Sequence, residues 1–127
     1  MRLFLVRHAE AAPGDPDDLR PLTPAGRDTA RELGARLAGE HPEAILTSPL
    51  LRARETAAAI AEASGLDAEA DERLAPGATA DDVRNAATGH GETVVAVGHQ
   101  PDCSEIVLAL TGREVRFAPG GYHEVRL

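Results

Sequence analysis

The sequence predicts one α/β domain of three layers, in which helices cover both faces of a mostly parallel sheet. Short apolar runs, typical of strands buried on both faces, occur at residues 3–6, 44–47 and 93–97. Each run leads into a segment with helical spacing of apolar residues, and this alternation with short connections favours right-handed crossovers. A chain of 127 residues suits a single domain, 1–127, with little room for an inserted lid domain.

The first unit is a strand at residues 3–6 that ends at Arg7 and His8. Residues 11–21 are rich in Pro, Asp and Gly, which predicts a loop that runs over the strand ends. Thr23 is then a helix N-cap with Pro24 at the first helical position. Apolar side chains continue at helical spacing opposite an arginine-rich face, at Ala30, Leu33, Leu37 and Ala38. We therefore expect a helix that covers the sheet.

The second unit repeats this form. After the strand at residues 44–47, Ser48 is expected to cap a helix with Pro49 in its first turn, and Gly65 to end it. Arg52 would then lie exposed in the first turn. Residues 68–74 predict a minor strand, and Thr79 is expected to cap a shorter helix that reaches residue 88.

The last unit begins with the strand at residues 93–97. A final helix follows, closed by Gly112, with its apolar stripe at Cys103, Ile106, Val107 and Leu110. Residues 119–121 predict a turn, and residues 122–127 alternate like a strand, for which an antiparallel place at a sheet edge is suitable.

Composition narrows the class of function. The formal charge of −8 argues against nucleic acid or an anionic membrane as the main partner. A single cysteine, Cys103, excludes an intramolecular disulfide and a multi-cysteine zinc site, and its place on the core stripe favours a structural role. All 13 basic residues are arginine, which excludes Schiff-base lysine chemistry. The N-terminus has too few apolar residues for a signal peptide, so we expect a cytoplasmic protein.

Cations and imidazoles follow the predicted parallel strands. Because the carboxyl ends of such strands meet at one edge of a sheet, Arg7, His8, Arg52 and His99 should converge there. Two guanidiniums could clamp a phosphoryl group, since each presents a planar fork to two oxygens. A neutral imidazole, with an unperturbed pKa of about 6.5, is a competent nucleophile near neutral pH. On these grounds either His8 or His99 could be the nucleophile.

Four stretches of the chain resemble motifs of the histidine phosphatase superfamily, in matching order and spacing. They are LVRHAE at residues 5–10, LTPAG at 22–26, SPLLRARETA at 48–57 and VGHQP at 97–101. The short chain and DDLRPLT at residues 17–23 look most like SixA-type phosphohistidine phosphatases. The resemblance implies a phosphoglycerate mutase-like fold, a nucleophilic His8, phosphoryl binding by Arg7 and Arg52, and a hydrogen bond donated by His99.

Two positions depart from the family pattern. Ala9 replaces the glycine that usually follows the histidine, a small change provided that the backbone there does not need a positive φ. Pro76, in ERLAPG at residues 72–77, stands where many members carry the general acid. Without that acid a phosphoramidate, whose imidazole leaves readily, is a better substrate than an alkyl ester. Replacement acids are sought among Asp17, Glu10 and Glu72.

Alternatives to these interpretations remain open. His8, His99 and a nearby glutamate could form a metal site, although two arginines would oppose a cation; we expect no metal and no cofactor. The domain could instead be a small-molecule phosphomonoesterase or a non-catalytic phospho-binding module, so its partner is a phosphorylated protein or a small phosphorylated metabolite. The remaining histidines and two further arginines are interpreted as surface groups: His41, His90, His123, Arg20 and Arg54.

Overall fold

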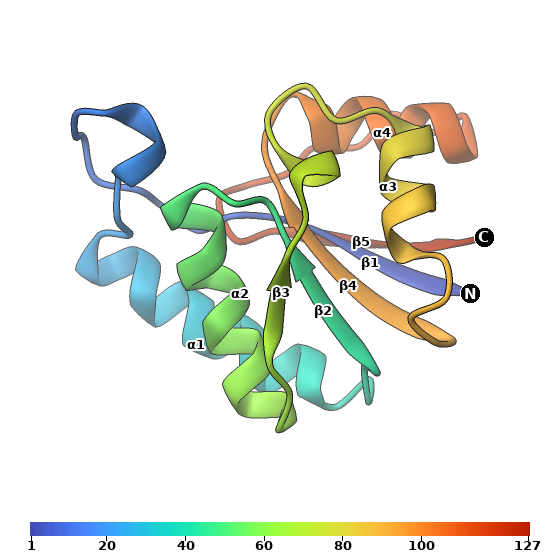
Figure 1. Ribbon diagram of the computed structural model, residues 1–127, viewed down its shortest axis with the longest axis horizontal. Helices are drawn as coiled ribbons and strands as arrows, with labels where there is room; N and C mark the ends of the chain where they lie inside the picture. The colour runs from blue at the N-terminus through green and yellow to red at the C-terminus, as the bar shows by residue number, and fades with distance from the viewer.

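A computed structural model describes all residues, 1–127, and contains one five-stranded sheet. The strands are β1 (Arg2–Arg7), β2 (Ala44–Thr47), β3 (Ala68–Ala70), β4 (Thr93–Gly98) and β5 (Tyr122–Arg126). They lie in the order β3-β2-β4-β1-β5 (Figure 1). All neighbours are parallel except β5, which pairs antiparallel with β1 at the edge of the sheet. The predicted α/β fold with a mostly parallel sheet is confirmed.

Helices cover both faces of this sheet. The helices α1 (Pro24–Ala38) and α2 (Leu51–Ser64) pack on one face, and α3 (Ala80–Ala87) and α4 (Asp102–Thr111) on the other (Figure 1). Alternate residues of β1 supply the two cores, since Phe4 and Val6 face α1 and α2 while Leu3 and Leu5 belong to the opposite cluster. The strands therefore carry continuous apolar runs because both faces are buried.

The register of the central strands decides where the chain leaves the sheet. Arg7 pairs with Gly98 and Thr47 with Val97, so β1, β2 and β4 end level with one another. The turn at Pro119–Gly121 precedes the antiparallel β5 and thus reaches the same edge, where the Gly120 N–H donates to the Arg7 and His8 carbonyls at 3.1 Å each. Four segments remote in sequence meet at this edge.

Most helix boundaries follow the sequence expectations. Thr23 and Thr79 accept hydrogen bonds from the first turns of α1 and α3, and Gly65 and Gly112 end α2 and α4 with positive φ. No helix is long and apolar enough to span a bilayer.

Two local expectations were wrong. The helix α2 begins at Leu51 rather than after Ser48, and its N-cap residue is Leu50; the Ser48 hydroxyl accepts from the Leu50 N–H at 3.2 Å and has a second partner described below. Only Ala68–Ala70 form strand β3, and the 3₁₀ turn η2 (Glu72–Leu74) follows it. The predicted loop at residues 11–21 is present; it contains a second such turn, η1 (Asp17–Leu19), and a bridge joins its flanks at Ala11 and Leu22.

Candidate active site

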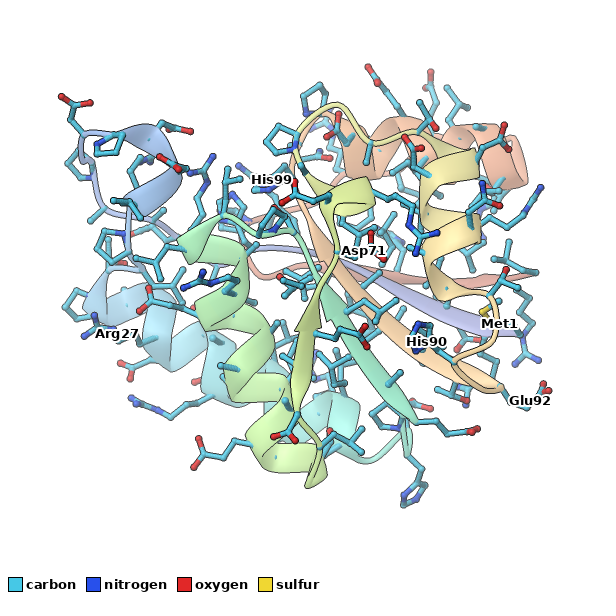
Figure 2. All side chains as sticks on the ribbon, viewed as in Figure 1. Met1, Arg27, Asp71, His90, Glu92 and His99 are labelled. Atoms are coloured by element: carbon cyan, nitrogen blue, oxygen red, sulfur yellow. The ribbon has the colours of Figure 1, made fainter.

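A pocket of about 400 Å³ opens at the carboxyl ends of β1 and β4. Arg7, His8, Arg52 and His99 all line it, so the predicted convergence of these four residues is confirmed. Figure 2 shows His99 at this edge of the sheet and Met1 and Glu92 at the opposite end. Residues from other segments complete the lining, namely Ala9, Glu10, Ala11, Arg20, Pro76, Gln100 and Pro119.

His8 is held with a defined ring orientation. Its Nδ1 lies 2.7 Å from the Ala9 carbonyl oxygen, and its backbone N–H donates to the Gly98 carbonyl at 3.1 Å. Because a carbonyl oxygen only accepts, the ring proton belongs on Nδ1, which leaves the lone pair on Nε2. Burial lowers the pKa of His8, and the positive charges of Arg52, Arg7 and Arg20 lower it further. The ring is therefore neutral near neutral pH, with an unprotonated Nε2.

This lowered pKa predicts the pH dependence of the site. A neutral His8 is available above its folded-state pKa, which lies below 6.5, so its nucleophilic form should persist into mildly acidic solution and be lost as pH falls through that pKa. We expect an NMR titration of the His8 ring, assigned by comparison with His8→Ala, to give an apparent pKa below the usual value. In Arg52→Ala the value should rise. A ring that titrates above 6.5 would contradict this environment.

Arg52 is buried, with 8% of its surface exposed, and the expectation of an exposed arginine was wrong. Its guanidinium donates from Nη1 to the Asp17 carbonyl at 2.8 Å and from Nη2 to Asp17 Oδ2 at 3.1 Å. The same turn of α2 holds two other segments: Glu55 Oε1 accepts from the Leu22 N–H at 2.7 Å, and Thr56 Oγ1 from the Ala9 N–H at 3.0 Å. One helical turn thus fixes the loop that follows β1.

Arg7 is oriented from the C-terminal side of the chain. Its Nη1 donates to the Phe117 carbonyl at 2.9 Å. The Phe117 ring packs edge-on against His123, with ring centroids 4.7 Å apart, and His123 Nε2 lies 3.1 Å from the Arg116 carbonyl. His123 is therefore more than the surface residue that the sequence suggested, since it braces the segment that supports Arg7.

His99 is paired with Ser48, a residue that sequence reasoning treated only as a helix cap. Ser48 is fully buried, and its Oγ lies 2.7 Å from His99 Nε2. The ring of His99 meets that of His8 edge-on, with centroids 5.2 Å apart. Burial, with the charges of His8 and Arg52, lowers the pKa of His99 to about 4, so both rings are neutral near neutral pH.

Two of the predicted site residues carry polar atoms without a partner. Arg7 Nε and His99 Nδ1 are buried and make no hydrogen bond, and Ser64 Oγ is the only other buried side-chain polar atom in this condition. Such atoms are rare in folded proteins because burying them unpaired is costly. Their concentration here indicates that this edge of the sheet is shaped for something other than stability.

The departures from the family pattern have clear structural outcomes. The backbone of Ala9 does not have a positive φ, so the alanine fits without strain, as expected. Pro76 lines the pocket in place of an acid, and Glu10 is the only carboxylate in the lining. Asp17 is bound to two arginines; hydrogen bonds from Arg20 and then Arg52 lower its pKa, which makes it a poor proton donor. Glu72 lies outside the lining.

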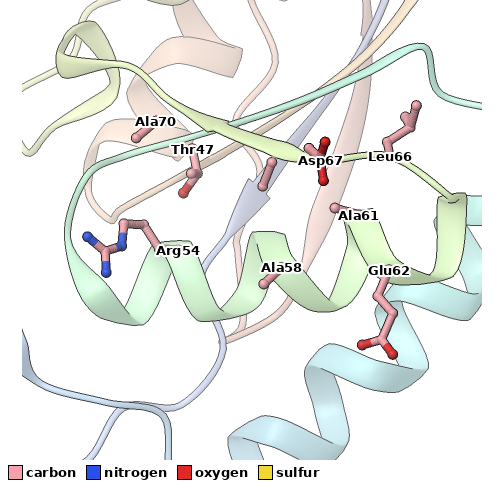
Figure 3. A pocket seen from close by; sticks show the side chains of 9 residues that line it. Thr47, Arg54, Ala58, Ala61, Glu62, Leu66, Asp67 and Ala70 are labelled. Atoms are coloured by element: carbon pink, nitrogen blue, oxygen red, sulfur yellow. The ribbon is translucent and has the colours of Figure 1, made fainter.

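The two arginines interpreted as solvated charges have different positions. Arg54 is exposed and lines another cavity, of about 500 Å³, between α2 and β3, where Figure 3 shows it with Glu62 and Asp67. That cavity contains no histidine. Arg20 instead lines the pocket of His8, where its side chain is 30% exposed. The spacing of Asp17 and Arg20, three residues apart on a short turn, was the available sequence signal.

The structure contains no set of side chains that would support the alternative hypothesis of a metal site. No group of three or more His, Cys, Asp or Glu side chains is arranged to hold a metal ion. Cys103 lies buried in the core, and burial raises the pKa of its thiol to about 12, in agreement with a structural role.

Comparisons with known proteins agree with this geometry. The model of the histidine phosphatase superfamily, branch 1, matches residues 3–76. An uncharacterized protein of Picosynechococcus is 37% identical over 97% of this chain and 78% of its own length. The phosphohistidine phosphatase SixA of Escherichia coli is 35% identical over 56% of this chain and 46% of its own length.

A solved structure resembles the whole chain. The protein histidine phosphatase SixA complexed with tungstate superposes with a TM-score of 0.88 at 28% identity, over 100% of this chain and 88% of that one. Sequence match, fold and the order of the motifs agree, and the chain belongs to branch 1 of the histidine phosphatase superfamily.

Proposed function

We propose that this protein removes the phosphoryl group from phosphohistidine in a protein, through a phosphohistidine intermediate on its own His8. The observation that carries the proposal is the His8 ring, whose Nδ1 faces the Ala9 carbonyl and whose free Nε2 belongs to a pocket lined by guanidiniums. Family membership makes the protein a phosphatase by class, and similarity to SixA proteins supports the narrower substrate.

The first step forms a bond between His8 Nε2 and phosphorus. The Nε2 lone pair attacks, and the bond from phosphorus to the leaving nitrogen breaks with its electron pair on that nitrogen. Arg7 and Arg52 hold the phosphoryl oxygens and offset their charge as the group moves. The leaving imidazole needs a proton, which it already carries when the substrate ring is protonated, so no acid from the protein is required.

The second step hydrolyses the phosphohistidine intermediate and regenerates the free enzyme. Water attacks phosphorus, the bond to His8 Nε2 breaks, and the electron pair returns to the ring; inorganic phosphate leaves with the proton that water gives up. The hydrogen bond from Nδ1 to the Ala9 carbonyl persists throughout, because it involves the other ring nitrogen. It also stabilises the positive charge that the ring carries while it is phosphorylated.

The proposed substrate preference follows from the lack of a suitable proton donor around the position of the phosphoryl group. Pro76 offers no proton, Asp17 is committed to two arginines, and the exposed Glu10 already accepts from Thr23 Oγ1 at 2.9 Å. A substrate whose leaving group departs unaided suits such a site. Phosphohistidine meets this condition, whereas an alkyl alcohol does not.

The test is a comparison of leaving groups. We expect kcat/KM for a phosphohistidine peptide and for phosphoramidate to exceed that for an alkyl phosphate by about 100-fold or more, because general acid catalysis is worth roughly 10²–10⁴ where it operates. An aryl phosphate should lie between them. Initial rates of phosphate release, measured side by side with and without EDTA, give the ratio and also test for a metal requirement.

Equal rates on alkyl phosphates would favour the second candidate, a small-molecule phosphomonoesterase. The presence of Glu10 in the pocket supports that candidate, since it is the one carboxylate there. Glu10→Gln would then be the first variant to make. If Glu10→Gln lost activity only on alkyl phosphates, Glu10 would be identified as the acid. If the wild-type protein turned over phosphohistidine and alkyl phosphates at equal rates, it would have no preference for phosphohistidine, which would contradict our proposal.

A further inference from the structure

The carboxylate of Asp17 bridges two guanidiniums that come from different parts of the chain. Its Oδ1 accepts from Arg20 Nη1 at 3.2 Å, and its Oδ2 accepts from Arg52 Nη2 at 3.1 Å. The Asp17 carbonyl oxygen also accepts from Arg52 Nη1 at 2.8 Å. The 3₁₀ turn η1 is thus tied to the first turn of α2, although the two are 35 residues apart.

Arg20 has a second attachment. Its Nε donates to the Ala12 carbonyl at 2.9 Å, so the guanidinium is held from both flanks of the loop at residues 11–21. Only the Nε and Nη1 groups are used in these contacts, and the guanidinium carries five N–H donors in all. Arg20 lines the same pocket as His8, and its side chain is 30% exposed, which is consistent with a group at the rim of the pocket.

An isolated surface ion pair would not call for a function, because such pairs contribute little to stability and are common. The chain provides a matched example, Asp28 and Arg31 on α1, with the same spacing of three residues and side chains 66% and 71% exposed. No third charged group takes part in that pair, and neither residue lines the pocket of His8. The pair formed by Asp17 and Arg20 differs in both respects, since it includes the buried Arg52 and borders the site.

We propose that Arg20 is a third guanidinium of the phosphoryl pocket and that Asp17 is the positioning residue that holds Arg20 and Arg52 toward it. The inference rests on the proposed phosphoryl transfer at this site and extends it to residues outside the four that the sequence indicated. Asp17 acts through the two arginines and does not itself contact the phosphoryl oxygens, which a carboxylate would repel.

The charges around His8 support this placement. Burial is the largest cause of the lowered pKa of His8, and the charges of Arg52, Arg7 and Arg20 follow in that order. Arg20 is therefore near enough to act on the ring electrostatically. A group that acts on the nucleophile across the pocket is also placed to act on a dianion bound between them.

The experiment measures oxyanion affinity, which needs no turnover. Binding of orthovanadate and of inorganic phosphate to the full chain is followed by calorimetry, and binding of phosphate also by ³¹P NMR. Arg20→Ala should weaken both by about tenfold or more, the equivalent of one charge-assisted hydrogen bond. Arg20→Lys should lie between Arg20→Ala and the wild type, because it keeps the charge but loses the fork. Arg31→Ala is the matched control and should bind as the wild type does.

The variant Asp17→Asn tests the role of Asp17, because the two possible roles predict opposite changes in oxyanion affinity. If Asp17 merely competes with the anion for the arginines, removal of its charge must strengthen oxyanion binding. If Asp17 positions them, the asparagine should weaken binding several-fold despite the more positive pocket, while Asp28→Asn changes nothing. Thermal unfolding of each variant checks that the fold is retained.

Three outcomes are decisive. Arg20→Ala and Arg20→Lys within twofold of the wild type would overturn the role of Arg20. Binding by Asp17→Asn equal to or tighter than that of the wild type would overturn the positioning role of Asp17. A wild-type chain that binds neither oxyanion would overturn the proposed function together with this inference, so failure of the two can be told apart.

Discussion

His8→Ala should eliminate turnover and the covalent phosphoenzyme together. The change removes the atom that forms the bond to phosphorus, and the Nε2 of the other imidazole in the pocket, that of His99, is already hydrogen-bonded to Ser48. Loss of a nucleophile costs on the order of 10⁴–10⁶ in kcat. Rapid acid and alkali quenches during turnover of phosphoramidate measure the intermediate, since phosphohistidine is labile in acid and stable in alkali.

The control for this variant is His41→Ala. His41 is exposed and lies far from the pocket in the loop before β2, so its loss should affect neither turnover nor labelling. A phosphoenzyme that survives in His8→Ala, or a label found on serine in the wild-type protein, would refute the assignment. Residual activity with no label would point instead to direct attack by water.

Arg52→Ala should have the second largest effect, about 10²–10³ in kcat/KM, the equivalent of roughly 3–4 kcal/mol of transition-state stabilisation. Two losses combine in it. The phosphoryl group loses a charge-assisted donor, and the Asp17 carbonyl and carboxylate lose the partner that fixes η1 near the pocket. Initial rates on phosphoramidate and an aryl phosphate give the ratio.

Because Arg52 is buried, its removal also loosens structure, and two further variants separate the effects. Arg52→Lys keeps the charge and most of the stem, so a large loss in this variant as well would show that the planar fork itself is needed. Arg54→Ala changes an exposed arginine on the same helix and should leave the rates unchanged. Near-normal turnover in Arg52→Ala would mean that another group holds the phosphoryl oxygens.

The arrangement of layers was predictable because the signal for it is local and repeated. Continuous apolar runs in β1, β2 and β4 reflect burial on both faces, and helical spacing between them reflects burial on one. Parallel strands with level ends then bring Arg7, His8 and His99 to one edge without any knowledge of side-chain contacts. The backbone topology alone is enough to place these three residues close together.

Side-chain partnerships were decided only by the tertiary structure. Ser48 followed by Pro49 is typical of a helix start, but the hydroxyl is placed 2.7 Å from His99, which is 51 residues away, and α2 begins later. No local sequence pattern indicates that Ser48 and His99 lie close together.

The burial of Arg52 and the position of Arg20 were likewise decided by the tertiary structure. Arg52 was expected to be exposed and Arg20 to be solvated, because a charged residue near a helix start or in a loop is usually in water. Folding of the loop at residues 11–21 onto α2 buries the first and brings the second to the pocket, with Asp17 between them. The sequence by itself therefore determined the layers and the edge where the chemistry lies, since both depend on periodicity. The tertiary structure decided which groups bond to one another there, since that depends on contacts between segments that no local pattern encodes.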